Sequence, residues 1–416
     1  MKLLVIGSGG REHAIAWKLA QNSKVETIYC APGNGGTAIE EKCENINIDD
    51  IDKLLDFAKE KNIDLTIVGP EEPLTKGIVD EFKKQGLKIF GPGKNGAILE
   101  GSKAFAKEFM KKYNVKTAEY ESFSNAEEAL KYIQHKEFPL VIKADGLAGG
   151  KGVVICYSLE EGKKAIEDIM IRENLKDAGK TIVIEEFLEG IEASILSITD
   201  GETIIPFLSA KDHKQILDGN RGPNTGGMGV ICPNPYVTND VMEKFTKDIM
   251  EPTLKGIKEE KMDFIGVIFF GLMITKKGVY LLEYNVRMGD PETQGVLSLM
   301  ESDFLEIIEK ALEKKLNNIE VKWSNKSACV VIAASSGYPG SYDKGKEIKI
   351  GELEESKVFM AGARLKDSIL TTSGGRVLAV VAQGSNIKEA REACYKDMKN
   401  IYFENIYYRK DIGLLN

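Results

Sequence analysis

Three polar side chains near residue 285 have the types and the spacing to bind a metal ion and a phosphate. Glu283, Asn285 and Arg287 alternate with apolar residues, so a β-strand would place all three on one face. A carboxylate and an amide oxygen suit Mg²⁺, while a guanidinium binds an anion through paired N–H groups. The alternative is a solvated strand face with an ion pair, but the segment GDPE at 289–292 follows in an apolar surround and favours the first interpretation.

A lysine and a glycine-rich loop earlier in the chain could bind the phosphates of a nucleotide. Lys143 lies in the apolar run 140–144, and DGLAGGKG follows at 145–152. This is not a Walker A loop, because glycine rather than Ser or Thr follows Lys151, and not a kinase loop, because the strand lysine precedes the glycines. The loop could close over a triphosphate, or it could be a long hairpin without a ligand.

A second glycine cluster, GSGGRE at residues 7–12, stands between an apolar run and a helical pattern. It departs from the dinucleotide-binding fingerprint, since Glu12 occupies the third glycine position and Cys30-Ala31 stand where an acidic residue would bind ribose. These departures disfavour a nicotinamide cofactor. A single phosphate at the helix N-terminus is the expected anion, and a tight turn that needs positive φ is the alternative.

Alternating strand and helix patterns must position these groups. Over residues 1–101 they predict a Rossmann-like α/β domain, in which a parallel sheet has helices on both faces. Its strands are expected at 2–6, 25–30, 65–68 and 88–90, with helices after residue 10 and at 51–61.

The rest of the chain is expected to form two further domains, 102–321 and 322–416. In the first, a small mobile α+β lobe at about 115–190 has strands at 140–144, 153–157 and 181–186 and a helix at 160–172. Hairpins should follow around Asp200-Gly201 and around 276–278. The last domain is a small α+β unit that ends with a helix at 387–400.

Composition limits the classes of function. The chain has 41 glycines in 416 residues, above the average of about 7%, and several of them lie in the loops described above. Its net charge of −8 disfavours a sequence-independent hold on nucleic acid or anionic membrane. Six scattered cysteines without metal spacing, and no signal peptide or membrane span, predict a cytoplasmic protein. We expect a monomer with small-molecule partners, no nucleic acid and no membrane.

Together, these features resemble the ATP-grasp ligases. The resemblance rests on Lys143, the loop 145–152, EEFL at 185–188 and EYN at 283–285, in this order. It implies that backbone groups of the hinge 185–188 hold adenine and that lysines hold the phosphates. The implied ATP contacts are Lys103, Lys143, Gly149, Gly150, Lys151, Glu185, Glu186, Phe187, Leu188 and Glu192, the last at the ribose.

Further motifs make the chain similar to one ATP-grasp family, the phosphoribosylamine–glycine ligases. That family joins glycine to 5-phosphoribosylamine with ATP through a glycyl phosphate, giving glycinamide ribonucleotide, ADP and phosphate in purine biosynthesis. The resemblance implies Mg²⁺ or Mn²⁺ at Glu283 and Asn285. The motifs are GSGGREHA at 7–14, PEEPL at 70–74, DHK at 212–214, GPNTGGMG at 222–229, GDPE at 289–292, SGYPG at 336–340, TSGGR at 372–376 and YRKDIG at 408–413.

The same comparison suggests which residues bind substrate and act in catalysis. We expect Asp212 to bind the glycine ammonium and Arg287 and Lys143 to stabilise the transferred phosphoryl group. His13 and His135 are expected to be structural, and so is His213, with a general base as its alternative role. The expected substrate contacts are Gly9, Gly10, Glu71, Asp212, Asn224, Gly226, Gly227 and Arg287.

The sequence also departs from the family pattern. Lys211, Gln215 and Asn220 replace the usual Gln, Arg and Asp around the DHK motif, and Met360 replaces a histidine. Relatives such as biotin carboxylase carry a further metal carboxylate twelve positions before Glu283, where this chain has Gly271. Glu283 and Asn285 must then supply most of the protein ligands to the metal.

The sequence is also compatible with other functions. The nearest is another ATP-grasp carboxylate–amine ligase or carboxylase, which dependence on substrate would distinguish. A nicotinamide oxidoreductase and a non-catalytic nucleotide sensor are the alternatives from other classes; nicotinamide binding would reveal the first, and a lack of ATP turnover the second.

Overall fold

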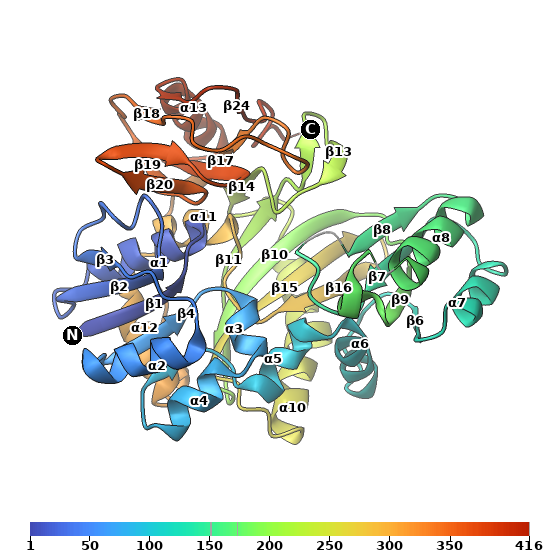
Figure 1. Ribbon diagram of the computed structural model, residues 1–416. Coiled ribbons are helices and arrows are strands. Elements are labelled where there is room, and N and C mark those ends of the chain that lie inside the picture. Colours follow the sequence, from blue (N-terminus) through green and yellow to red (C-terminus); the bar gives the residue numbers. More distant parts are fainter. Residues whose placement is uncertain (150–151, 173, 416) are drawn as a thin grey trace.

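The computed structural model describes residues 1–149, 152–172 and 174–415 as a mixed α/β structure (Figure 1). A parallel sheet forms the N-terminal part, and a large antiparallel sheet runs through the middle. A small lobe, coloured teal and green, projects on one side, and the C-terminal part (residues 327–415), in red, lies on another (Figure 1). The predicted fold class is confirmed.

The N-terminal sheet has five parallel strands in the order β3-β2-β1-β4-β5. Leu3, Leu4 and Val5 of β1 are fully buried, as expected where helices cover both faces of a parallel sheet. β2 begins at Thr27, which pairs with Lys2, so the predicted strand start at 25 is two residues early. The elements are β1 (Lys2–Gly7), α1 (Gly10–Ala20), β2 (Thr27–Pro32), β3 (Cys43–Asn45), α2 (Ile51–Glu60), β4 (Leu65–Val68), α3 (Glu71–Thr75), α4 (Ile78–Lys84), β5 (Ile89–Phe90) and α5 (Lys94–Gly101).

The small lobe is a four-stranded antiparallel sheet in the order β6-β9-β7-β8. It has a core of its own, which includes Ile133, Ile142, Ile166 and Ile184. The predicted helix 160–172 is divided, because its last turn closes with a bond from Arg172 N to Glu167 O, five residues back. The elements are α6 (Lys103–Lys112), which precedes the lobe, β6 (Tyr120–Phe123), α7 (Ala126–Ile133), β7 (Leu140–Ala144), β8 (Val153–Cys156), α8 (Leu159–Ile166), the π-helical turn η1 (Glu167–Ile171), η2 (Lys176–Gly179) and β9 (Ile182–Glu186).

The central sheet has the order β16-β15-β10-β11-β14-β17-β22-β19. Both predicted hairpins are present in it, β10–β11 and β15–β16. At the first turn Asp200 Oδ1 accepts the N–H groups of Glu202 and Thr203, at 2.9 and 2.7 Å. The elements are β10 (Ile191–Thr199), β11 (Ile204–Asp212), β12 (Gln215–Leu217), β13 (Arg221–Asn224), β14 (Gly229–Cys232), α9 (Asn239–Phe245), η3 (Thr246–Met250), α10 (Glu251–Glu259), β15 (Gly266–Thr275), β16 (Gly278–Asn285), α11 (Glu292–Leu299), α12 (Phe304–Leu312) and η4 (Leu316–Asn318).

The C-terminal part extends the central sheet. Its first strand, β17, pairs with β14, so that Gly229 lies opposite Val331. Helix α13 packs against β17 and β22. No helix in the described part of the chain is long and apolar enough to cross a membrane. The elements are β17 (Ser327–Ser335), β18 (Lys349–Ile350), β19 (Ser356–Met360), β20 (Ala363–Lys366), β21 (Ile369–Thr372), β22 (Arg376–Gly384), α13 (Ile387–Met398), β23 (Ile401–Tyr402) and β24 (Ile406–Tyr407).

Candidate active site

The end of β16 carries the predicted metal ligands. Glu283 lies directly opposite Gly271 of β15, so a carboxylate at position 271 would share its face. A Cβ atom at Gly271 would lie 3.2 Å from Glu283 Cγ, which shows how closely the two positions approach. Among the described residues Glu283 has no hydrogen-bond or ion-pair partner. Its carboxylate is therefore available to a cation.

Several cations surround this carboxylate. Burial alone would raise the pKa of Glu283, but Lys214, Lys143 and further basic groups hold the pKa below its ordinary value. Within the described residues no cluster of three or more His, Cys, Asp or Glu side chains could enclose a metal ion. A Mg²⁺ ion held by Glu283 and Asn285 would thus complete its shell with water and phosphate oxygens, which suits this ion. The residues present fit such a metal.

A buried ion-pair network aims Lys143 at this region. Glu185, in β9, is buried between two lysines, with Oε1 2.8 Å from Lys143 Nζ and Oε2 3.1 Å from Lys107 Nζ. Lys143 Nζ also donates to Leu282 O at 3.2 Å. Burial lowers the pKa of Lys107 to about 8, although Glu185 opposes the shift. Glu185, itself a predicted ATP contact, therefore orients the lysine that is expected to bind phosphate.

The hinge that follows β9 has an occupied amide at Glu186 and an available amide at Leu188. The N–H of Glu186 donates to Glu119 O at 3.0 Å, whereas the N–H of Leu188 has no partner among the described residues. The Phe187 ring lies 6.4 Å from that of Tyr157. The free Leu188 amide is the hinge group that could bind an adenine edge.

The expected ribose ligand, Glu192, forms an ion pair in this structure. Its Oε2 lies 2.7 Å from Lys214 Nζ. Glu192 raises the pKa of Lys214, and the nearby Glu283 and Asp212 add to the shift while burial opposes it. Lys214 thus stays protonated between the expected ribose, metal and glycine positions.

The glycine loop of the lobe is attached to the start of α6. Asp145 Oδ1 accepts the Ser102 hydroxyl at 2.8 Å and the N–H of Ala104 at 2.7 Å. Lys103 is the first residue of that helix, and it is one of the cations that lower the pKa of Glu283. Gly149 has φ = +56°, and no atom of the described residues lies within 4 Å of the position that a Cβ would take there. The predicted contacts Gly150 and Lys151 lie outside the described residues.

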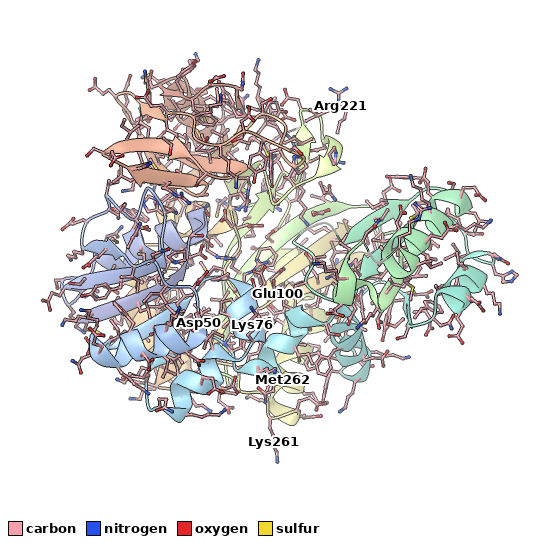
Figure 2. The ribbon with its side chains drawn as sticks, viewed as in Figure 1. Asp50, Lys76, Glu100, Arg221, Lys261 and Met262 are labelled. Carbon is pink, nitrogen blue, oxygen red and sulfur yellow. The ribbon has the colours of Figure 1, made fainter. Side chains whose placement is uncertain are left out.

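Arg287 joins the N-terminal part to the central sheet. Its guanidinium lies 3.1 Å from Glu71 Oε2, 2.9 Å from Glu100 Oε1 and 3.1 Å from Asn285 Oδ1. Glu100 lies in the interior (Figure 2), and its Oε2 accepts the N–H of Val286 at 2.7 Å. Burial opposes the charge of Arg287, but Glu100 and Glu71 raise its pKa. The structure brings together the predicted residues Glu71, Asn285 and Arg287.

The glycine loop at residues 7–12 binds the carboxylate of Glu12 through one of its amides, and the expected phosphate there remains a prediction. Gly9 N donates to Glu12 Oε2 at 2.6 Å, so Glu12 satisfies the amide that was expected to meet an anion. A Cβ at Gly9 would lie 2.9 Å from Asp290 Oδ2, and one at Gly10 would lie 2.5 Å from Gln294 Nε2. The bare backbone of these two glycines allows the 290–294 segment to approach closely.

Asp212 lies beside the glycine-rich loop at residues 222–229. Its Oδ1 atom is shielded from solvent and has no hydrogen-bond partner among the described residues. Burial and the neighbouring carboxylate of Glu292 raise the pKa of Asp212. Gly227 has φ = +111°, and a Cβ there would lie 2.7 Å from Asp212 Oδ1 and 2.6 Å from Pro291 Cδ. An unpaired buried carboxylate next to bare backbone suits a small ammonium ligand.

Two residues of the C-terminal part hold the loop 222–229 through hydrogen bonds to Gly226. Arg376 donates to Gly226 O at 2.6 Å and to Asp290 O at 2.7 Å. Gly226 N donates to the Tyr338 hydroxyl at 3.1 Å. Asn224, the last residue of β13, is exposed beside this loop.

His13 and His213 are both buried and hydrogen-bonded within the chain. His13 Nδ1 accepts the N–H of Met360 at 2.8 Å, and its Nε2 lies 3.1 Å from Glu40 Oε2. His213 is buried with Nδ1 3.1 Å from Gly229 O, so this nitrogen must carry the proton. Burial and the charge of Arg409 lower the pKa of His213 to about 4. A histidine that is already hydrogen-bonded to the backbone and this hard to protonate is a poor general base.

We expect His213→Gln to weaken the pH dependence of folding stability. The pKa of His213 is about 4 in the folded chain and ordinarily 6.5, so the unfolded chain binds more protons between these values. Stability is therefore lost as pH falls through this window, and His213 accounts for about 2 kcal/mol between pH 7 and 5. Urea unfolding at both pH values measures the difference. His135→Gln, at an exposed site, should keep the wild-type slope; an unchanged slope in the His213 variant would refute the assignment.

Four further side chains contact the candidate site or shift a pKa in it, and none of them was singled out from the sequence: Lys107, Lys214, Glu292 and Arg376. Lys214, Glu292 and Arg376 lie within motifs that carried the resemblance, but nothing in their spacing indicated a role. Lys107 follows Lys103 by one helical turn, which was the only available signal. All four act on other parts of the site across large sequence distances.

Family models match almost the whole chain. They are the N domain of phosphoribosylglycinamide synthetase at residues 1–100, its ATP-grasp (A) domain at 101–293 and its C domain at 328–415. The chain is 62% identical to the phosphoribosylamine–glycine ligase of Clostridium acetobutylicum over 413 residues, which is 99% of each chain. It is 48% identical to that of Escherichia coli O157:H7 over 420 residues, covering 99% of this chain and 98% of the relative.

Solved structures agree with these matches. The phosphoribosylamine–glycine ligase of Thermotoga maritima superposes with a TM-score of 0.86 at 36% identity, covering 99% of this chain and all of that one. The biotin carboxylase domain of the Hydrogenobacter thermophilus 2-oxoglutarate carboxylase has a TM-score of 0.73 at 16% identity, covering 98% of this chain and 91% of that one, and shares the fold alone. The chain belongs to the phosphoribosylglycinamide synthetase family.

Proposed function

We propose that the residues around Glu283 carry out the reaction of this family, with the site contacts described above. The chain is an ATP-dependent ligase that joins glycine to 5-phosphoribosylamine and releases glycinamide ribonucleotide, ADP and phosphate, a step of purine biosynthesis. The observation that best supports this site is the partnerless Glu283 carboxylate among several cations. A carboxylate–amine ligation needs such a site because ATP must first activate the carboxylate.

In the first step a carboxylate oxygen of glycine attacks the γ-phosphorus of ATP. The bond from this phosphorus to the β–γ bridging oxygen breaks, which releases ADP and leaves glycyl phosphate. Lys103 and Lys143, which Glu185 orients, neutralise negative charge on the transferred phosphoryl group. Positioning and such charge neutralisation are the main contributions of a protein to phosphoryl transfer. Arg287 adds to this charge. Glu283 and Asn285 would hold a Mg²⁺ or Mn²⁺ ion, which supplies further charge neutralisation when bound.

In the second step the amine nitrogen of phosphoribosylamine attacks the acyl carbon. The new C–N bond forms, the C–O bond to phosphate breaks, the amine loses a proton and phosphate leaves. Asp212 holds the glycine ammonium, and Gly226, Gly227 and Asn224 lie against the substrates. Closure of the 145–152 loop would exclude water, which otherwise hydrolyses glycyl phosphate.

Adenine is proposed to lie against the hinge. The free N–H of Leu188 donates to it, Phe187 packs on it and Glu192 binds the ribose hydroxyls, which requires the Glu192–Lys214 ion pair to be shared with nucleotide. Gly9, Gly10 and Glu71 line the phosphoribosylamine side.

Substrate dependence tests this function. Purified protein should form ADP only when glycine, phosphoribosylamine and Mg-ATP are all present. ADP formation driven equally by bicarbonate and biotin, with no response to glycine, would contradict it in favour of a carboxylase.

We further propose a cytoplasmic monomer with small-molecule partners alone. The surplus of eight negative charges disfavours nucleic acid and anionic membranes, and all six cysteines are free thiols in the structure. Sedimentation equilibrium should give the chain mass of 45.9 kDa; twice that mass would refute the monomer.

A further inference from the structure

A short hairpin links the two halves of the proposed substrate site. Strands β12 and β13 stand between Asp212, at the end of β11, and the loop at Gly226. The hairpin pairs through Gln215 with Asn224 and Leu217 with Arg221, and β13 is exposed along its length. The hairpin projects beside the C-terminal part, where Arg221 is labelled (Figure 2). A two-stranded hairpin of this size is marginal by itself, so its position depends on what it packs against.

Arg409 supplies that support. Its side chain is fully buried, at 0% exposure. Nε and Nη2 donate to Asp411 Oδ1 and Oδ2 at 2.8 and 2.7 Å, a two-point pair that fixes the guanidinium. Nη1 donates to Gln215 O at 2.9 Å and Nη2 to Asn220 Oδ1 at 3.0 Å. One guanidinium thus contacts the first strand of the hairpin and its turn.

Neighbouring residues of the same tail add three contacts to the hairpin. Asp411 Oδ2 accepts the N–H of Gly219 at 2.8 Å, and the Tyr407 hydroxyl donates to Ile216 O at 2.7 Å. The N–H of Lys410 donates to Asp218 Oδ1 at 2.9 Å. The tail segment 407–411 therefore holds the hairpin at every residue from 215 to 220 except Leu217.

We propose that Arg409 is a positioning residue for the glycine and phosphoribosylamine half of the site. It holds the hairpin in place, and the hairpin sets the separation of Asp212 from Asn224 and Gly226. This inference rests on the proposed function of those residues. Among the described residues no hydrogen bond or ion pair joins the tail segment 407–411 to the nucleotide half, on the small lobe and β16, so ATP binding should not depend on Arg409.

Two substitutions at Asn220 give the sharpest test. Asn220 has φ = +52°, which glycine adopts without strain, so Asn220→Gly removes only the amide that Arg409 binds. Asn220→Asp keeps an acceptor at the same place. We expect Asn220→Gly to raise KM for glycine and phosphoribosylamine two- to threefold, and Asn220→Asp to stay near wild type.

Arg409→Lys keeps the charge but loses the fixed fork of donors. We expect it to raise both substrate KM values about tenfold, since hydrogen bonds to a charged group are lost, with KM for ATP within twofold of wild type. Lys346→Met, which breaks the surface pair of the same C-terminal part with Glu404 at 2.8 Å, should change none of them.

The possible results separate the claims. Wild-type KM values for every substrate in both Arg409→Lys and Asn220→Gly would overturn the positioning role, and so would an equal rise in KM for ATP. If Arg409→Lys does not fold, the two Asn220 variants decide the question. A wild-type enzyme without glycine-dependent ADP formation would instead refute the proposed function itself.

Discussion

Glu283→Ala is expected to lower kcat about 10²–10³-fold without unfolding the chain. This carboxylate has no partner among the described residues, and basic side chains surround it. Its proposed role is to hold the ion that neutralises the transferring phosphoryl group, and loss of one electrostatic stabiliser of a transition state costs this much. ADP release at saturating glycine, phosphoribosylamine and Mg-ATP measures the effect.

The control for this substitution is Glu202→Ala, a surface carboxylate 3.0 Å from Lys258. It should leave kcat unchanged, because it lies outside the site. Glu283→Gln should lose nearly as much activity as Glu283→Ala, since an amide is a weaker ligand for a divalent ion than a carboxylate. Activity of Glu283→Ala near that of wild type would remove Glu283 from the metal site.

Asp212→Asn is expected to raise KM for glycine by about tenfold to a hundredfold, with KM for ATP unchanged. Asp212 Oδ1 is buried without a hydrogen-bond partner among the described residues, and burial and the carboxylate of Glu292 raise the pKa of Asp212. An ammonium group placed there would offset both effects and form a charge-assisted hydrogen bond, whose loss costs about 1.5–3 kcal/mol. Steady-state kinetics with varied glycine measures the change.

Asp240→Asn provides the matched control, because that aspartate pairs with Lys244 on the surface of α9. It should leave all KM values unchanged. An equal rise in KM for ATP and glycine in Asp212→Asn would indicate a general disturbance of the site. An unchanged KM for glycine would place the ammonium elsewhere.

Much of the fold could be predicted from local pattern. The buried apolar run of β1 and the turn at Asp200-Gly201 have unambiguous short-range signatures, and the structure has a strand and a hairpin there. The ends of elements were less certain. The start of β2 depends on its register with β1, and the division of the helix after Ile166 depends on a bond between residues 167 and 172.

The continuity of the central sheet could not be predicted. β14 and β17 are separated by almost a hundred residues, yet they pair, and the sheet continues through them into the C-terminal part. Nothing in either strand identifies its partner, since both are simply short and apolar. Long-range pairing of this kind is decided by the packing of the whole chain.

The grouping of candidate site residues was predictable where a residue type and its spacing indicate a particular ligand. Glu283 and Asn285 lie on the predicted strand, which ends at Asn285; Arg287 follows the strand, contrary to the prediction, but still donates to Asn285 Oδ1. The side chains that hold these candidate site residues in place were not predictable. The side chains of Lys107, Arg376 and Arg409 act on Glu185, Gly226 and Asn220, and only the folded chain brings these pairs together.

The origin of the phosphate oxygen tests the central claim most directly. If ATP activates the carboxyl group of glycine, glycine labelled with ¹⁸O in both carboxyl oxygens should transfer one ¹⁸O to inorganic phosphate and keep the other in the amide of the product. Mass spectrometry of the phosphate gives the answer. Phosphate without ¹⁸O, formed while the ligation proceeds, would contradict a glycyl phosphate intermediate.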